Sequence, residues 1–265
     1  MGNLMRAAIV ILFGLSTAAQ AQDFPMMDWG PIIQTEAMNS AVDEIGRSEA
    51  KRAGLPYPGD PRAAESASSV RASLAQGLAK QITDGGAPAP AVMADYAPNS
   101  AVRQKLAGIM GDAAAKHDRA KGEEMRQLVL SGQAVTEYER VAPMLGFRAN
   151  DAIDAYAFYL LAQWGVASNH RADVTRRQAA GVRRQAANAY AGIAGQLETD
   201  ALRQEFAEML VIQGIILAGV HEAAVRSGDD AASARYAALA RRGGEIIFSI
   251  DPARIDLTDT GFRIK

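Results

Sequence analysis

The sequence predicts an all-α protein: a helical bundle with an extended C-terminal tail and a loosely attached N-terminal helical arm. Two observations support this fold class. Apolar residues recur at helical spacing, and no stretch alternates with a period of two for long. The chain of 265 residues also has only 6% aromatic residues and no cysteine. Because no disulfide can form, stability must come from apolar area buried in the bundle.

The first residues predict a secretory signal peptide. Arg6 precedes an unbroken apolar run from Ala7 to Leu15, and small residues at Ala19 and Ala21 occupy the positions that a signal peptidase reads. A bilayer span needs about 20 apolar residues, so this run is too short to be one. We expect residues 1–21 to be removed and the mature protein to be periplasmic or secreted, with no transmembrane segment; an uncleaved anchor is the alternative. No cysteine follows that would carry a lipid anchor.

Residues 22–94 form the predicted N-terminal arm, which contains two helices. Pro31 suits the first position of a helix that runs to about Arg52. A second helix fits Ser68 to Thr83. Segments rich in proline and glycine, at 54–62 and 84–90, interrupt the arm after each helix.

Residues 95–265 form the predicted bundle domain, in which capping residues and glycines mark the helix ends. The expected helices run from Asn99 or Ser100 to about Lys116, from Asp118 to Gly132, from about Val135 to Leu145, from Asn150 or Asp151 through "DAIDAYAFYLLAQWGVASN", from an Asp173 cap through the arginine repeat, from Thr199 or Asp200 to Gly228, and from about Asp230 to Arg242, where Gly243 and Gly244 end the last one. The following tail is expected to be extended and to lie across the bundle as a strap.

The helix from Ala201 to Ser227 is the predicted centre of the core. It contains "MLVIQGIILAGV", in which Gln213 is the only polar side chain. This stretch is too short for a membrane span and too apolar for a surface helix. Gln163 lies on a second apolar helix. Buried amides need partners, so we expect both glutamines to bond each other or backbone carbonyls.

Four separated motifs indicate a family. They are "YAPNSAVR" at 96–103, "DAIDAYAFYLLAQWGVA" at 151–167, "FAEMLVIQGIIL" at 206–217 and "IDLTDTGF" at 255–262. In this order they resemble a bacterial secreted family of alanine-rich helical proteins that is catalogued only as a domain of unknown function. The sequence departs from the pattern at 158–159, where Phe-Tyr replaces a tryptophan-rich pair. The resemblance implies a strand-like tail but no reaction, cofactor or catalytic residue.

The residues give no positive sign of catalysis. Without cysteine, thiolate chemistry and the usual structural zinc sites are excluded. His117, His170 and His221 all lie near predicted helix ends, where imidazoles are commonly exposed to solvent. His221-Glu222 lacks the second histidine of a zinc-protease motif, and "SEAK" at 48–51 has none of the motifs that accompany S-x-x-K in serine acylases. We therefore expect no catalytic residue, metal or cofactor; an unrecognised envelope hydrolase is the remaining enzyme alternative.

The stretch "RRQAAGVRRQAANAY" repeats its first five residues after seven and places Arg176, Arg177, Arg183 and Arg184 in one basic wedge of a helix. The alanines of the repeat lie mostly on the opposite side, where they favour close helix packing. The residues expected beside Arg184 in the neighbouring helices are apolar, so the guanidinium groups should point to solvent. The wedge is a candidate anion- or partner-binding site, because the guanidinium fork binds oxyanions; a solvated face is the alternative.

Charge limits the class of partner. The chain has 28 basic and 30 acidic residues, a net charge of −2, and loss of Arg6 with the signal peptide makes it −3. A nucleic-acid binder would be strongly basic, so we do not expect one. The predicted function is an exported, non-catalytic binding or interaction module of the cell envelope whose partner is an envelope protein or an anionic ligand.

An apolar small-ligand carrier is the alternative function. Its pocket would lie between the Asp151 and Ala201 helices, near Tyr156, Gln163, Trp164 and Gln213. The sequence predicts neither the identity of a ligand nor the oligomeric state.

Overall fold

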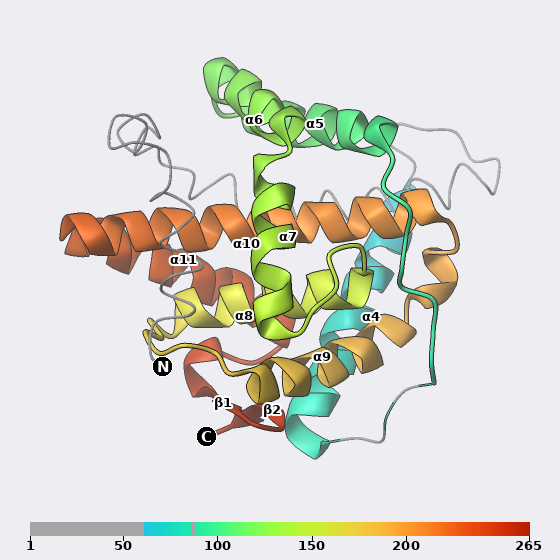
Figure 1. Cartoon of the computed structure of the whole chain (residues 1–265), viewed down its shortest axis with the longest axis vertical. Helices are drawn as coiled ribbons and strands as arrows, with labels where there is room; N and C mark the ends of the chain where they lie inside the picture. The colour runs from blue at the N-terminus through green and yellow to red at the C-terminus, as the bar shows by residue number, and fades with distance from the viewer. Residues whose placement is uncertain (1–60, 86–87, 89) are drawn as a thin grey trace.

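The computed structural model describes residues 61–85, 88 and 90–265 (Figure 1). Within these residues it contains eight α-helices and one two-stranded sheet, which confirms the all-α class. The signal peptide and the first helix of the arm lie outside the described residues. The helices are α4 (Pro61–Asp84), α5 (Ser100–Ala115), α6 (Arg119–Ser131), α7 (Gln133–Leu145), α8 (Ala152–Ala167), α9 (Arg176–Ala191), α10 (Asp200–Ser227) and α11 (Asp230–Phe248).

Most helix ends follow the predicted capping residues. At the starts of four helices a capping side chain accepts a hydrogen bond from a backbone N–H group of the first turn. The capping residues are Asn99 for α5, Asp118 for α6, Asp151 for α8 and Thr199 for α10. Glycines in the left-handed conformation end α6, α7 and α10 at Gly132, Gly146 and Gly228. Local sequence therefore determines these boundaries.

Three predicted boundaries are wrong. α4 begins at Pro61, earlier than the predicted start at Ser68. The cap of α9 is Thr175 rather than Asp173, and it forms a reciprocal capping box with Gln178. α11 does not end at Gly243 but continues to Phe248. Gly244 has a packing reason instead of a terminating one: a Cβ added there would lie 2.3 Å from Cγ of Pro252.

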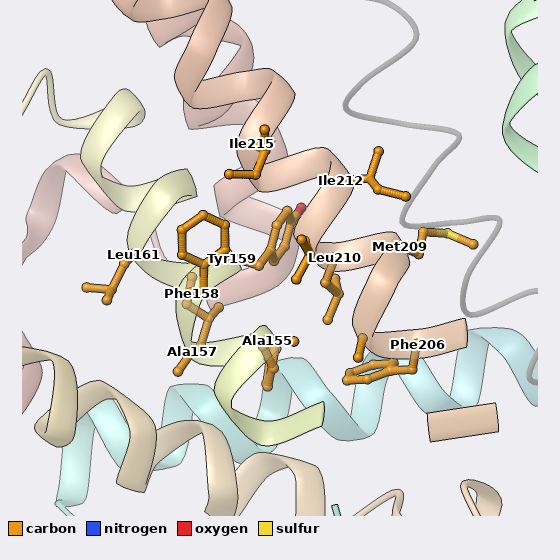
Figure 2. Close-up of a cluster of buried hydrophobic side chains, with 14 of the residues drawn as sticks. Ala155, Ala157, Phe158, Tyr159, Leu161, Phe206, Met209, Leu210, Ile212 and Ile215 are labelled. Carbon is orange, nitrogen blue, oxygen red and sulfur yellow. The ribbon is translucent and has the colours of Figure 1, made fainter. Parts of the chain in front are cut away.

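The centre of the fold is the contact between α8 and α10. Figure 2 shows Tyr159 of α8 beside Leu210 of α10. The helices approach closely at Gly214, where a Cβ would lie 3.0 Å from Cε1 of Phe158. α10 is long and apolar enough to cross a membrane, but 78% of its most apolar stretch is buried inside the fold. It occupies the position predicted for the central core helix.

α4 is part of the core, although it belongs to the segment predicted as an arm. Its residues Val70, Leu74, Leu78 and Ile82 are buried, and their spacing of four forms one apolar stripe. This stripe packs against α9, α11 and the sheet. The loose attachment expected of the arm therefore does not hold for α4.

The α5–α6 pair lies on the opposite side of α10 from α8 and α9 (Figure 1). Polar contacts join α5 to α10: Arg103 donates two hydrogen bonds to the buried carboxylate of Glu208, at 3.1 and 2.9 Å, and Lys105 pairs with Glu205. This side of α10 is consequently more polar than the side that packs on α8.

The tail forms a hairpin rather than a continuous strap. β1 (Ile255–Thr258) pairs with β2 (Gly261–Ile264) in antiparallel register, with Leu257 opposite Phe262. The side-chain amide of Gln185 in α9 binds the backbone of Phe262 twice, accepting from its N–H and donating to its carbonyl, both at 2.8 Å. These two hydrogen bonds hold the hairpin against α9.

Candidate functional site

The four arginines of the repeat do not form one free basic surface. Arg183 is one-third exposed and pairs with Asp154, with Asp151 3.9 Å away. Arg176 donates to the backbone carbonyls of Met144 and Pro143, at 3.1 and 2.9 Å. Each of these two guanidinium groups therefore has a partner within the fold, although Arg176 is itself exposed.

The other two arginines of the repeat are exposed. The side chain of Arg177 is 86% exposed and lies 3.9 Å from Asp259, and Arg184 is also exposed. The expectation that all four would point to solvent is wrong, because the acidic start of α8, and not an apolar stretch, faces Arg183. What remains is two solvated cations, which is weak support for an anion site.

The acidic cluster at the start of α8 has a structural explanation. Asp151 accepts the backbone N–H of Asp154 as a helix cap, and Asp154 accepts the backbone N–H of Arg148 at 3.0 Å. Burial raises the pKa of Asp151, while the N–H bond from Asp154 acts in the opposite direction. Arg148 and Arg183 supply the compensating charge. This cluster stabilises the helix start and closes it to an incoming anion.

A pocket of about 360 Å³ lies between the second half of α8, the turn at 168–174 and the second half of α10. Its wall is mostly apolar and is formed by Leu161, Ala162, Trp164, Gly165, Val166, His170, Arg171, Ala172, Asp173, Val174, Ala218, His221, Glu222, Val225 and Arg226. The indole of Trp164 is held in place because its Nε1 donates to the carbonyl of Ile255 at 2.9 Å. The pocket lies between the two helices that the sequence indicated.

Of the predicted pocket residues, only Trp164 lines this cavity. Gln163 is buried beside α11 and donates to the carbonyl of Ala240 at 2.8 Å, which confirms a backbone partner. Gln213 is also buried, but neither atom of its amide has a hydrogen-bond partner, and the hydroxyl of Tyr156 has none. Tyr156 and Gln213 lie deeper in the core, where their side chains face packed atoms instead of the pocket.

Two histidines line the pocket. The ring centroid of His170 lies 4.6 Å from that of Trp164, with the planes tilted by 45°. His221 is only 8% exposed, and its Nε2 lies 3.3 Å from the hydroxyl of Ser233 in α11. The expectation that all three histidines would be exposed is therefore wrong for His221, because α11 packs over this residue.

Burial sets the charge of both rings. Desolvation lowers the pKa of His170. Two effects lower the pKa of His221, namely desolvation and the nearby positive charge of Arg171. Both imidazoles are therefore neutral near pH 7 and offer one donor and one acceptor nitrogen each.

The sequence did not indicate that His170, Arg171 and His221 lie at one site. A signal for the first two was the stretch "SNHRADV" at 168–174, which begins four residues after Trp164 and carries no helix-forming apolar spacing. No group of three or more metal-ligating side chains occurs among the residues that the structure describes.

The fold and this pocket define an all-α protein with a mostly apolar cavity between two core helices. The chain belongs to a family of unknown function, DUF6683, whose model matches residues 4–265. This confirms the relationship that the four motifs indicated, and it assigns no activity. No curated protein and no solved structure matches the chain.

Proposed function

We propose that the protein is an exported, non-catalytic binding protein that holds a small, largely apolar ligand in the pocket between α8 and α10. The observation that carries the proposal is the cavity beside Trp164. Ligand pockets commonly have about 300–1,000 Å³, with mostly apolar walls and a few polar groups that orient the ligand. This pocket has that volume range and that composition, which favours the carrier over the arginine surface as the binding site.

The position of the pocket also supports binding. Elsewhere α8 packs closely against α10, as the contact of Phe158 with Gly214 shows. Beyond Trp164 the turn at 168–174 separates α8 from α9 and contributes His170 to the wall. When an apolar ligand covers the apolar surface of the pocket, the burial stabilises the complex by roughly 25 cal/mol per Å².

Trp164 allows a direct test of the pocket. The chain has two tryptophans, Trp29 and Trp164, so the variant Trp29→Phe leaves one reporter in the pocket wall. Titration of this mature variant with 1-decanol should change the intensity and wavelength of its emission in a saturable way. No saturable change with decanol or with its carboxylate or ammonium analogues would contradict the proposed site.

A pocket-filling variant provides the control. Ala218 lines the pocket and is buried, so Ala218→Leu should occupy part of the cavity and abolish the titration. Ala180→Leu makes the same change at an exposed position of α9 and should leave binding unchanged. Thermal melts of both variants would establish that they fold. Equal affinity in the two variants would place any binding elsewhere.

Export is proposed from the predicted signal peptide. The expected mature protein begins at Gln22, after the small residues of the cleavage site. The test is the intact mass of the protein from the envelope fraction of its host. A mass that includes residues 1–21 would contradict cleavage, and recovery with the cytoplasm would contradict export.

A further inference from the structure

One cation in the pocket wall has no acidic partner among the residues that the structure describes. Arg171 lines the cavity from the turn at 168–174 and is exposed. Its positive charge acts on His221, which lines the cavity from α10. Arg171 and His221 therefore line the same cavity from two different elements.

Beside Arg171, the wall contains five other charged or titratable groups, namely His170, Asp173, His221, Glu222 and Arg226. Asp173 and Arg226 both take part in interactions of their own. Glu222 is half-buried and stands four residues before Arg226 on α10, a spacing that places an acid and a base on one helix face. His170 and His221 are neutral near pH 7 because of their burial. Arg171 is thus the charge of the wall that a ligand can satisfy.

We propose that the ligand is an amphiphilic carboxylate, with its hydrocarbon part beside Trp164 and Ala218 and its carboxylate paired with Arg171. A mostly apolar wall with the guanidinium group of Arg171 at one side complements such a molecule, and guanidinium binds a carboxylate through two parallel hydrogen bonds. The neutral ring of His221 supplies a further polar group without adding charge.

This inference rests on the proposed function, and it needs a test that separates the two. Decanoate and 1-decanol have hydrocarbon parts of similar length and differ in the head group, so their comparison isolates the carboxylate. Binding of each to the Trp29→Phe protein would be followed at Trp164 at pH 7.5. The key variant is Arg171→Gln, and the matched control is Arg184→Gln, since Arg184 is an exposed arginine of α9 outside the pocket wall.

We expect Arg171→Gln to weaken decanoate binding by about tenfold, the scale of one charge-assisted contact, and to change decanol binding by less than about twofold. Arg171→Lys should restore part of the decanoate affinity, because it retains the charge without the fork. Arg184→Gln should leave both affinities unchanged. Decanoate binding should also weaken at high salt, whereas decanol binding should not.

Three contrary results have different meanings. If neither ligand binds, the proposed function is wrong and this inference falls with it. If both bind and Arg171→Gln weakens them equally or not at all, the pocket is a ligand site but the carboxylate class is wrong. If decylammonium binds more tightly than decanoate, the pocket selects a cation through Glu222 and the inference is overturned.

Discussion

Replacing Gly181 by alanine tests how the hairpin is docked. Gly181 lies inside α9, where alanine is favoured over glycine by about 1 kcal/mol on helix propensity alone. A Cβ added there would lie 2.2 Å from the backbone nitrogen of Gly261 and 2.5 Å from the carbonyl carbon of Thr260. Both are backbone atoms, so no side-chain rotation relieves the overlap. The turn of the hairpin must move away from α9.

The displacement gives the magnitude. Ordinary contact of a Cβ begins at 3.4 Å, so the hairpin must retreat by about 1.2 Å from its present 2.2 Å. The two bonds between the Gln185 amide and Phe262, now 2.8 Å long, would then exceed hydrogen-bonding distance. Leaving buried polar groups unpaired costs about 1–3 kcal/mol for each. The two lost bonds therefore cost about 2–6 kcal/mol together, and after the gain in helix propensity we expect Gly181→Ala to lower the free energy of unfolding by roughly 1–5 kcal/mol.

The matched control is Gly108→Ala. Gly108 is also inside a helix, α5, but no atom lies within 4 Å of the position of its added Cβ. This variant should be more stable than the parent by up to about 1 kcal/mol. Urea unfolding at 25 °C, with equal slopes in denaturant, would measure both changes. Equal stability of the two variants would refute the claim that the hairpin is held against α9 by this contact.

Four further substitutions test polar groups of the fold. Stability should fall as the pH drops below 6.5, because His221 binds a proton more readily in the unfolded chain than in the folded protein, where its pKa is lowered. His221→Asn should reduce this loss, as measured by urea midpoints between about pH 7.5 and 5. Gln213→Leu should raise the free energy of unfolding by about 1–3 kcal/mol, because the Gln213 amide is buried without partners. Gln163→Leu should not raise it, because the Gln163 amide donates to a backbone carbonyl. Equal effects of the two variants would be inconsistent with this bonding. Arg183→Gln should cost about 1–3 kcal/mol at pH 7, below the usual loss for a fully buried pair because Arg183 is one-third exposed. The same loss in an Asp154→Asn background would rule out the ion pair as its cause.

The helical class and most helix ends were predictable because they depend on local chemistry. Asn99, Asp118 and Thr199 cap helices through bonds to residues two or three positions away, which sequence alone specifies. The end of α11 was not predictable in this way. Gly244 is required by the approach of Pro252, a contact that depends on how the chain returns after the helix.

The candidate site was predictable only in part for the same reason. The repeat placed four arginines on one side of α9, but the carboxylate that binds Arg183 comes from α8. The two helices that form the pocket, and Trp164 within it, followed from their apolar character. His170 and Arg171 were missed because the turn that carries them takes its position from the helices on either side.

The hairpin has a consequence for the order of events during synthesis. Translation produces α8 and α9 before residues 255–264, yet Phe262 fills the aromatic cluster with Trp164 and Phe248, and Gln185 of α9 has its partners in β2. A nascent chain that ends before the hairpin exposes the indole and leaves that amide to water. The complete packing around Trp164 can therefore form only after the ribosome has released this segment, so the last residues to be synthesised complete a cluster whose first member, Trp164, was made more than ninety residues earlier.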